Sequence, residues 1–580
     1  MRTHRSRHWP TGMAVLAAAG MTAAATVPAL ASTPELSARI YLAGRDPAGL
    51  AAYARAVSQP TSPDYQHYLT PTQVQTRFGA TPAQVTAITT WLADSGLRVT
   101  ATTPHYVAVT GPPAALGTRI PARLAPAVLT ITTTPVPLSE DSTPVDVGNC
   151  ATYYGQKPAI GLPPAYGTTP SYDTCGYTPA QVRAAYGVSG SGRTGHGATV
   201  AVVDAAAAPT MAADANTYST RNGLPTWRAG QYTENLPADI ATSCRQTTTY
   251  GEESMDVEDV HAMAPDADIV YVGADCANLG DDLLDAETRI VDAHLADIVS
   301  DSWHLGTTED QVPAELIPAY ERVFEQGAVE GIGFYFAAGD DGDWSRDDAT
   351  HQPAVQYPGS DPWVTSVGGT SLAVGPNGTY EWEVPWGDDL APLSPDGTTW
   401  SDPPGVFYFG TGGGPSARFA QPGYQRGIVP DALSEQRGTP ARVIPDIAAD
   451  ADLATGLRYG HTTTTAGYEE FRGDGTSQAT PLIAGIQADA QQARHGVPIG
   501  FANPAIYARY GTPAFHDITD DPPGVPTPIA VVDQERDPGT GATSTGLGTL
   551  GQDTSLTATP GYDDTTGVGT PSACYLDSYR

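Results

Sequence analysis

Basic side chains are scarce in this sequence of 580 residues. Lys157 is the one lysine, and 29 lysines and arginines stand against 64 aspartates and glutamates, which gives a formal net charge of −35. Nucleic acids and anionic membrane surfaces are bound through a cationic face, and this composition cannot supply one. We therefore expect neither nucleic acid nor a membrane among the partners of the protein.

Long hydrophobic runs are also missing, except near the first residues. Arginines at positions 2, 5 and 7 precede an alanine-rich run over 13–27, and Ala29-Leu30-Ala31 has the small-x-small pattern of a signal-peptidase site. The run is short for a transmembrane anchor, and Gly20 interrupts it. The pattern predicts a signal peptide over 1–31 and a protein that is secreted to the extracellular space.

Cysteine is rare, and no Cys-x-x-Cys motif or Cys/His cluster occurs, which argues against a zinc site. Disulfides are allowed outside the cytosol. We expect Cys150 to pair with Cys175, and Cys244 with Cys276, because each pair closes a modest loop. Cys574 is then left without a partner.

The length exceeds what one hydrophobic core normally holds, and the composition changes along the chain. Residues 32–140 contain three helix-like segments followed by two strand-like ones, as expected for a small α/β domain. Residues 141–176 are rich in Thr, Pro, Gly and Tyr without periodicity, which is typical of a linker. The main domain is expected to span 177–580.

Buried strands alternate with helices in the main domain. Apolar runs such as 198–204, 297–300 and 333–337 read as strands, and 281–295 has the apolar periodicity of a helix. This alternation predicts a parallel sheet covered by helices on both faces, with reactive groups at the carboxyl ends of the strands. Residues 375–430, rich in Gly, Pro and Trp, look like long surface loops.

A nucleophile candidate opens an apolar helix. Gly475-Thr476-Ser477 forms a turn that places a hydroxyl at a helix N-terminus, where a nearby oxyanion meets partial positive charge. Taken alone, this tripeptide is more often an ordinary helix cap.

Acidic candidates lie in other segments. Glu252 and Asp256 are four positions apart in a helical stretch, so both carboxylates lie on one face and can share a proton. Asp340 follows a strand ending in Gly339, and Trp303 follows another strand end. The alternatives are a solvated acidic face, a cation-binding loop after the strand, and a packing role for the tryptophan.

In this order, these segments resemble the sedolisin family of secreted serine-carboxyl peptidases. That family carries its acids in E-x-x-x-D and its serine in S-G-T-S-x-x-x-P, which Glu252 with Asp256 and Ser477 with Pro481 match. The segment 60–79 resembles a kumamolisin-like activation propeptide. The resemblance covers nearly the whole mature chain, and the ordered set is far more specific than any one motif.

The resemblance implies a subtilisin-like parallel sheet flanked by helices and preceded by a small α/β prodomain. It assigns Ser477 as the nucleophile, Glu252 as the base, Asp256 as its support and Asp340 as the donor to the oxyanion. Trp303 is expected in the substrate cleft.

The resemblance also implies a structural calcium ion. Two segments match the family's calcium loop, which assigns one Ca²⁺ to Asp517, Ile518, Thr559, Gly561 and Asp563. Carboxylates and backbone carbonyls are the oxygen ligands that calcium prefers. An ordinary acidic turn is the alternative.

Two residues near the motifs depart from the family pattern. Asp474 replaces the usual serine three places before Ser477, and His304 follows Trp303 where glycine is common. Both departures concern the expected substrate cleft.

The sequence thus predicts a secreted, acid-active peptidase of proteins or peptides. It is expected to be a monomer, made as a zymogen that its own propeptide inhibits and that cuts itself between about 131 and 176 at an exposed segment. A glutamate base accepts protons in acid, where histidine is already charged, so the optimum is expected at roughly pH 3 to 5.

Two other interpretations of the function stay open. A subtilisin-type protease would need His-Gly-Thr-His and Asp-Ser/Thr-Gly segments, and Asp204 is instead followed by two alanines. A catalytically inactive binding protein on the same scaffold is the second. Whether a peptidase of this kind would act as an endopeptidase or release tripeptides is not readable from the sequence.

Overall fold

The computed structural model describes most of the chain. The described residues are 36–116, 120–133, 146–147, 149–238, 240, 244, 250–306, 308–346, 352–436, 438–463, 467–536 and 543–580. The expected signal peptide over 1–31 lies outside them, as do parts of the expected propeptide and linker.

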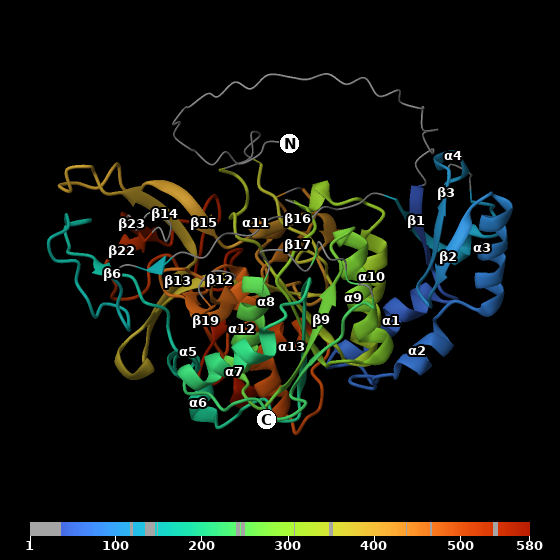
Figure 1. Cartoon of the computed structure of the whole chain (residues 1–580), viewed down its shortest axis with the longest axis horizontal. Coiled ribbons are helices and arrows are strands. Elements are labelled where there is room, and N and C mark those ends of the chain that lie inside the picture. Colours follow the sequence, from blue (N-terminus) through green and yellow to red (C-terminus); the bar gives the residue numbers. More distant parts are fainter. Residues whose placement is uncertain are drawn as a thin grey trace, which may run out of the picture.

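The first described part of the chain is a small N-terminal domain (Figure 1). Its antiparallel sheet has the strand order β2-β3-β1-β4 and packs on α3, whereas α2 packs with α1 in a separate cluster. Threonines cap the first residues of both helices, Thr70 for α2 and Thr81 for α3. The elements are β1 (Leu36–Leu42), α1 (Pro47–Ser58), α2 (Pro71–Arg77), α3 (Pro82–Asp94), β2 (Arg98–Thr102), β3 (Tyr106–Gly111), α4 (Pro113–Leu116) and β4 (Val128–Thr132). The expected helices and β2 and β3 are present, whereas β1 and β4 were not predicted.

The main domain is built on a mainly parallel sheet. Its order is β13-β12-β11-β10-β7-β9-β8, with β18 beside β12, and β13 is the antiparallel member. The strands are β7 (Thr199–Ala205), β8 (Tyr232–Glu234), β9 (Asp268–Ala274), β10 (Ile298–Asp301), β11 (Gly333–Ala337), β12 (Thr365–Val374), β13 (Tyr380–Pro385) and β18 (Ile447–Asp450). This confirms the predicted subtilisin-like α/β fold.

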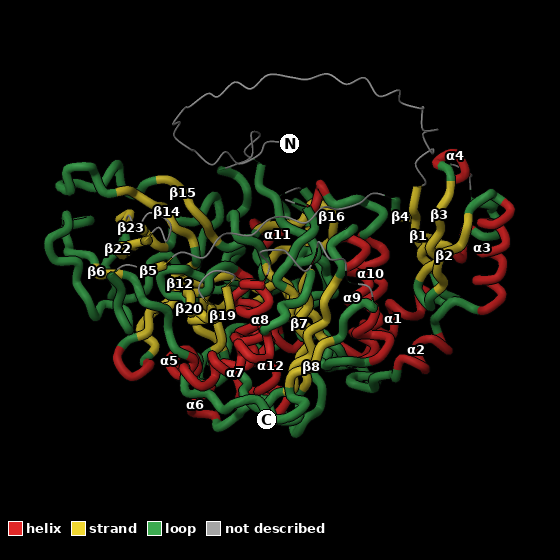
Figure 2. Tube along the Cα trace, in the orientation of Figure 1, coloured by secondary structure: helices red, strands yellow, loops and turns green. Residues whose placement is uncertain are grey.

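Helices cover both faces of this sheet, as Figure 2 shows. One face packs on α8 (Tyr250–Met263) and α12 (Thr476–Ala493), and the other on α9 (Leu279–Ala293) and α10 (Ile317–Glu330). Successive residues of β10 alternate between them, with Ile298 in the first core and Val299 in the second. The next side chains past β10 are therefore divided between the same two faces.

The remaining elements are short or form small sheets. They are α5 (Pro179–Ala185), α6 (Val188–Ser191), α7 (Met211–Arg221), β16 (Gly414–Ala420), α11 (Asp431–Ser434), β17 (Ala441–Ile444), β19 (Arg458–Thr463), β20 (Gly467–Arg472), α13 (Asn503–Tyr507), β21 (Phe515–His516) and β24 (Thr570–Pro571). The β19–β20 hairpin matters most here, because it leads directly into α12.

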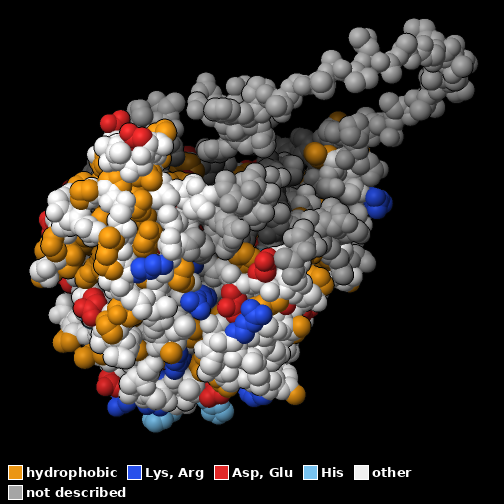
Figure 3. Space-filling view, turned by 60° about the vertical axis from the view of Figure 1, so that its left-hand side comes forward, with side chains coloured by type: hydrophobic (Ala, Val, Ile, Leu, Met, Phe, Trp, Pro, Cys, Tyr) orange, Lys and Arg blue, Asp and Glu red, His pale blue; other side chains and the backbone are white. Residues whose placement is uncertain are grey.

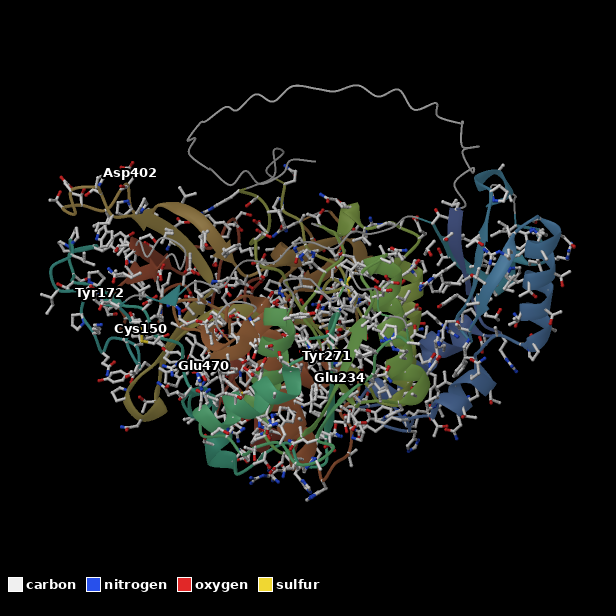
Figure 4. All side chains as sticks on the ribbon, in the orientation of Figure 1. Cys150, Tyr172, Glu234, Tyr271, Asp402 and Glu470 are labelled. Carbon is white, nitrogen blue, oxygen red and sulfur yellow. A yellow bond between two sulfur atoms is a disulfide. The ribbon has the colours of Figure 1, made fainter. Side chains whose placement is uncertain are left out.

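A second sheet, the accessory sheet, joins three distant parts of the chain. Its path is β15-β14-β23-β22-β5, and β6 pairs with β22. The strands are β5 (Asp146–Val147), β6 (Ser171–Tyr172), β14 (Gly387–Pro392), β15 (Val406–Gly410), β22 (Ile529–Arg536) and β23 (Thr543–Leu550). Figure 4 places Cys150, Tyr172 and Asp402 together on this side of the molecule.

The accessory sheet corrects the expectation of surface loops over 375–430. Four strands, β13 to β16, lie in that range. Of these, β13 belongs to the main sheet, β14 and β15 to the accessory sheet, and β16 pairs with β17. The Gly- and Pro-rich sequence does not reveal β14, because this strand is stabilised by pairing with β23, more than 150 positions later. Figure 3 shows hydrophobic side chains grouped on the exposed surface of this side.

The expected linker is likewise structured in its second part. Residues 149–176 contain β6, and the Cys150–Cys175 disulfide closes this segment as predicted. The Cys244–Cys276 disulfide was also predicted, and Cys574 is free and exposed. No helix among the described residues has the length and apolar character needed to cross a membrane.

The N-terminal domain docks on the α9–α10 face of the main domain. Tyr41 and Tyr106 enter the core formed with these helices, and Leu50 packs in a cluster with Val329. Arg39 supplies charge to the contact, with its guanidinium 2.9 Å from a carboxylate oxygen of Asp285.

Candidate active site

The turn before α12 fixes the position of Ser477. Gly475 has φ 84°, a left-handed conformation that favours glycine, and a Cβ there would lie 3.0 Å from Oδ2 of Asp340. Its N–H donates to the carbonyl of Ala451, after β18. Ser477 is therefore presented as the second residue of α12, partly exposed, while Thr476 beside it is buried.

Asp256 lies against the nucleophile turn from α8. Its side chain is fully buried, and Oδ1 is 2.9 Å from the hydroxyl of Ser302, which follows β10. The same hydroxyl is 3.1 Å from the carbonyl oxygen of Ser477, and the Ser477 hydroxyl is 3.4 Å from the carbonyl of Ser302. Burial, followed by the charge of Asp204, raises the pKa of Asp256 well above its usual value.

Glu252 lies one helical turn before Asp256, at the partly exposed start of α8. The charge of Glu252 acts on the buried phenol of Tyr459, in the hairpin that leads to Ser477. The neighbouring Gly251 faces the same hairpin, where a Cβ would lie 3.6 Å from the Tyr459 hydroxyl. The base candidate is thus on the side of α8 that meets the nucleophile segment.

Asp340 approaches the same turn from the end of β11. Its Oδ1 accepts hydrogen bonds from the Thr476 N–H at 2.7 Å and the Thr476 hydroxyl at 2.8 Å. Because Oδ1 is occupied as an acceptor, a proton on this carboxyl belongs on Oδ2. Burial raises the pKa of Asp340, while the Thr476 hydrogen bonds and the charge of His304 oppose the rise.

The structure therefore brings Ser477, Asp256 and Asp340 to one rim, at the carboxyl ends of β10 and β11 and the start of α12. Sequence reasoning missed Ser302 and Thr476, which make the direct contacts. The available signal was position, because Ser302 immediately follows a buried strand and Thr476 immediately precedes the nucleophile.

Trp303 takes the packing role weighed in the sequence. It is 8% exposed and meets Phe336 edge to face, with ring centroids 5.0 Å apart, and it also packs on Tyr320. Its ring belongs to the α9–α10 core. The alternation past β10 explains this, since Ser302 turns to the nucleophile and the next residue turns away.

Both departures from the family pattern face Asp340. Nδ1 of His304 lies 2.6 Å from the carbonyl oxygen of Gly306. Burial lowers the pKa of His304 below its usual value, and the hydrogen bond to Gly306 and the charge of Asp340 oppose this change. Asp474 has its pKa raised to about 7, first by burial and then by the charge of Asp340, with Arg472 opposing.

The expected calcium ligands lie on two neighbouring loops, since β21 pairs with β24. The carboxylate of Asp517 accepts the N–H of Gly561 at 3.0 Å. Asp563 is buried, its Oδ1 accepts four hydrogen bonds from Thr565 and Thr566, and its Oδ2 has one contact at 3.3 Å.

The surroundings of these loops suit a cation. Both carboxylate oxygens of Asp553 are buried, and the charges of Asp520 and Asp563 act on them. Burial and this repulsion raise the pKa of Asp553 well above its usual value. The described residues also bring Cys244, Asp275 and Cys276 together, but the disulfide occupies both sulfurs.

Fold and site together define a subtilisin-like protein with a serine surrounded by carboxyl groups. Residues 190–505, more than half of the chain, match the subtilase family, and the chain belongs to it. Residues 22–133 match the pro-kumamolisin activation domain.

Relatives support the same grouping. Kumamolisin of Bacillus sp. (strain MN-32) is 35% identical over 278 residues, which are 47% of this chain and 44% of that protein. Sedolisin of Pseudomonas sp. (strain 101) is 25% identical over 504 residues, covering 82% of this chain and 79% of that protein. The chain thus spans less than half the length of kumamolisin.

A solved structure shows the same fold. It is of Pseudomonas sedolisin, a serine-carboxyl proteinase, in complex with two molecules of pseudo-iodotyrostatin. The TM-score is 0.52 at 22% identity, over 71% of this chain and 98% of that one. The predicted resemblance to the sedolisins and their kumamolisin-like propeptide is confirmed.

Proposed function

We propose that the chain is a secreted, acid-active serine-carboxyl peptidase that hydrolyses proteins or peptides. The main support is that two buried aspartates contact the turn before α12. Asp256 is linked to Ser477 through the hydroxyl of Ser302, and Asp340 is hydrogen-bonded to Thr476. A serine beside several carboxyl groups matches general-base catalysis by an acid rather than by histidine.

In the proposed reaction the Ser477 hydroxyl attacks the peptide carbonyl carbon and gives its proton to Glu252. Burial disfavours a charge on Asp256, so the pair loses its first proton from the more exposed Glu252. The Glu252 carboxylate is then the base while Asp256 keeps its proton. Glu252 later returns the proton to the leaving amine, and the acyl group on Ser477 is released by water.

Asp340 is assigned to the oxyanion. Its Oδ2 is the oxygen available to carry a proton, because Thr476 occupies Oδ1. A protonated Oδ2 donates a hydrogen bond to the developing negative charge, whereas an ionised carboxylate would repel it. Burial of Asp340 favours the protonated form.

The test is peptide hydrolysis by the full chain after acid treatment, near pH 4. Ser477→Ala and Glu252→Ala should each lose at least about a thousandfold in kcat/KM, the order of effect for a nucleophile or its base. Ser394→Ala, a hydroxyl on the β14–β15 connection, is the control. Activity that survives Ser477→Ala contradicts the proposal and favours the reading as a binding protein.

We further propose that the chain is a monomeric zymogen. The match to an activation domain and its docking on α9 and α10 support residues 32–140 as an intramolecular inhibitor. The activating cut belongs between 133 and 146, because β5 pairs with β22 and residues from 149 onward are held by the Cys150–Cys175 disulfide and β6. Mass spectrometry of the processed protein locates the cut.

One calcium ion is proposed to tie the β21 and β24 loops. The side chains of Asp517 and Asp563, with the carbonyls of Ile518, Thr559 and Gly561, would hold it. The buried, mutually repelling carboxylates around Asp553 support a cation in this region. Its contribution there is structural.

A further inference from the structure

Ser302 occupies a position between two groups that both need its single hydrogen. Its hydroxyl is 2.9 Å from Oδ1 of Asp256 and 3.1 Å from the carbonyl oxygen of Ser477. A carbonyl oxygen can only accept, and an ionised carboxylate can only accept. One hydroxyl hydrogen cannot serve both.

Both contacts are hydrogen bonds only if Asp256 carries a proton. Asp256 then donates to the oxygen of Ser302, and Ser302 donates to the carbonyl of Ser477. The buried setting of Asp256 favours this arrangement, and the charges of Asp204, Asp259 and Glu253 disfavour a further negative charge there.

Pro481 explains why the carbonyl of Ser477 is available. In a helix this carbonyl accepts the N–H four residues on, which is position 481 in α12. Proline has no N–H, so the intrahelical partner is missing. The preceding carbonyl, of Thr476, is occupied by the Thr480 hydroxyl at 2.7 Å.

We propose that Ser302 is a positioning residue that connects the protonated Asp256 to the backbone of the nucleophile, through a carbonyl that Pro481 leaves open. This inference rests on the proposed peptidase function. Ser302 joins the end of β10 to both α8 and α12, so it holds the first turn of the nucleophile helix against the acid pair. When Asp256 ionises, the Ser302 hydrogen turns to the carboxylate and the carbonyl of Ser477 is released.

Several acidic groups act on Asp256. Asp204 at the end of β7 and Glu253 and Asp259 on α8 contribute negative charge, and Asp301 on β10 and Tyr271 on β9 interact with it as well. The hydroxyl of Ser302 contacts Asp256 directly. Changes at Ser302 should therefore appear directly in the titration of the Glu252–Asp256 pair.

The first test compares pH profiles of kcat/KM for full-length variants after acid treatment. Ser302→Ala removes the link and should lower kcat about tenfold with little change in KM, as for one lost hydrogen bond in a buried site. It also removes a donor that can turn to ionised Asp256, so the acid limb should move to higher pH. Ser302→Thr keeps the hydroxyl and should restore both.

Pro481→Ala should shift the acid limb the opposite way. The restored N–H takes the carbonyl of Ser477, and the freed Ser302 hydrogen favours ionised Asp256. The acid limb then moves to lower pH. A purely structural role for Ser302 and Pro481 predicts lower activity in both variants without opposite displacements, and that result would overturn the proposal.

A second readout needs no catalysis. Burial raises the pKa of Asp256 in the folded protein, so its contribution to stability is full below about pH 4, the unfolded value, and falls as pH rises toward the folded pKa. In the Ser477→Ala background, the fall in melting temperature from pH 4 to pH 7 should be larger in Ser302→Ala and smaller in Pro481→Ala. These shifts without peptidase activity in the parent would refute the proposed function alone. Peptidase activity without the shifts would refute the link.

Discussion

At the scale of single residues, the site is notable for two buried aspartates whose pKa values are raised by burial. Asp340 and Asp256 are both buried, and burial favours their protonated forms at a pH where exposed aspartates are ionised. Their neighbours differ, since Asp340 faces two donors on Thr476 and Asp256 faces one hydroxyl. Each carboxyl can therefore hold its proton for a different step.

Asp340→Asn should keep more activity than Asp340→Ala, because the amide is a neutral donor that never ionises. We expect Asp340→Asn to retain at least about tenfold more kcat/KM than Asp340→Ala and to lose the alkaline limb. A pH–rate profile of both variants measures this. Equal losses, with the limb unchanged, would sink the protonated-donor role.

His304 should set how far toward neutral pH the enzyme works. Its charge lowers the pKa of Asp340, so His304→Gly or His304→Gln should raise that pKa and move the alkaline limb upward by roughly 0.5 pH unit. Profiles of kcat/KM are the measurement.

Asp474→Ser is the control for this shift. Asp474 is a like-charged neighbour of Asp340, so its removal cannot raise the pKa of Asp340. An upward shift in this variant as well, or none in the His304 variants, would contradict the assignment.

The sequence proposes the chemical groups of the site but not their contacts. Ser477, Glu252, Asp256 and Asp340 lie in motifs whose spacing carries over, but a motif does not reveal which neighbour supplies a hydrogen bond. The role of Ser302 depends on β10 lying beside α12, which only the three-dimensional structure shows. That contact spans 175 positions in sequence.

At the scale of elements, the proposed calcium loops should affect the thermal stability of the fold. Calcium would bind the folded protein and not the unfolded chain, so chelation at neutral pH should lower the melting temperature by about 5 °C. Asp517→Asn should show the lower value without chelator and should lose calcium in elemental analysis. Asp577→Asn is the control, because Asp577 is an exposed acid near the last residue. Identical melting curves with and without chelator would contradict the proposed calcium site.

Elements rich in local pattern were predicted, and those that depend on distant partners were not. Strands β7 and β11 are continuous apolar runs, and α9 has a clear apolar stripe, so each was recognised. Strands β14 and β15 lie among glycines and prolines and exist because β23 pairs with β14. Local composition cannot indicate a partner that far along the chain.

At the scale of the whole molecule, the propeptide contact should respond to acid. Arg39 reaches Asp285 and Asp281 on α9, and burial raises the pKa of Asp285 while Arg39 lowers it. Protonation of Asp285 as pH falls removes the charge that Arg39 binds, so this ion pair weakens in acid. The attraction is present above the pKa of the carboxyl group and is lost below it, whereas the burial that raises this pKa acts in the opposite direction.

Arg39→Ala should therefore raise the pH at which the precursor is processed, by roughly one unit or less. Processing is followed by gel electrophoresis over a pH series. Arg98→Ala, an exposed arginine on the edge strand β2, should process like the parent. An unchanged threshold in Arg39→Ala would show that another contact controls release.

The accessory sheet also sets an order in time. Strand β23 lies between β14 and β22, so the two halves of the accessory sheet are not joined until residues 543–550 have been synthesised. The N-terminal domain is complete hundreds of residues earlier, because its sheet uses only residues up to 132. The N-terminal domain can thus fold while the main domain still lacks its last strands. Under the proposed function, the inhibiting domain is therefore folded before the catalytic domain is complete.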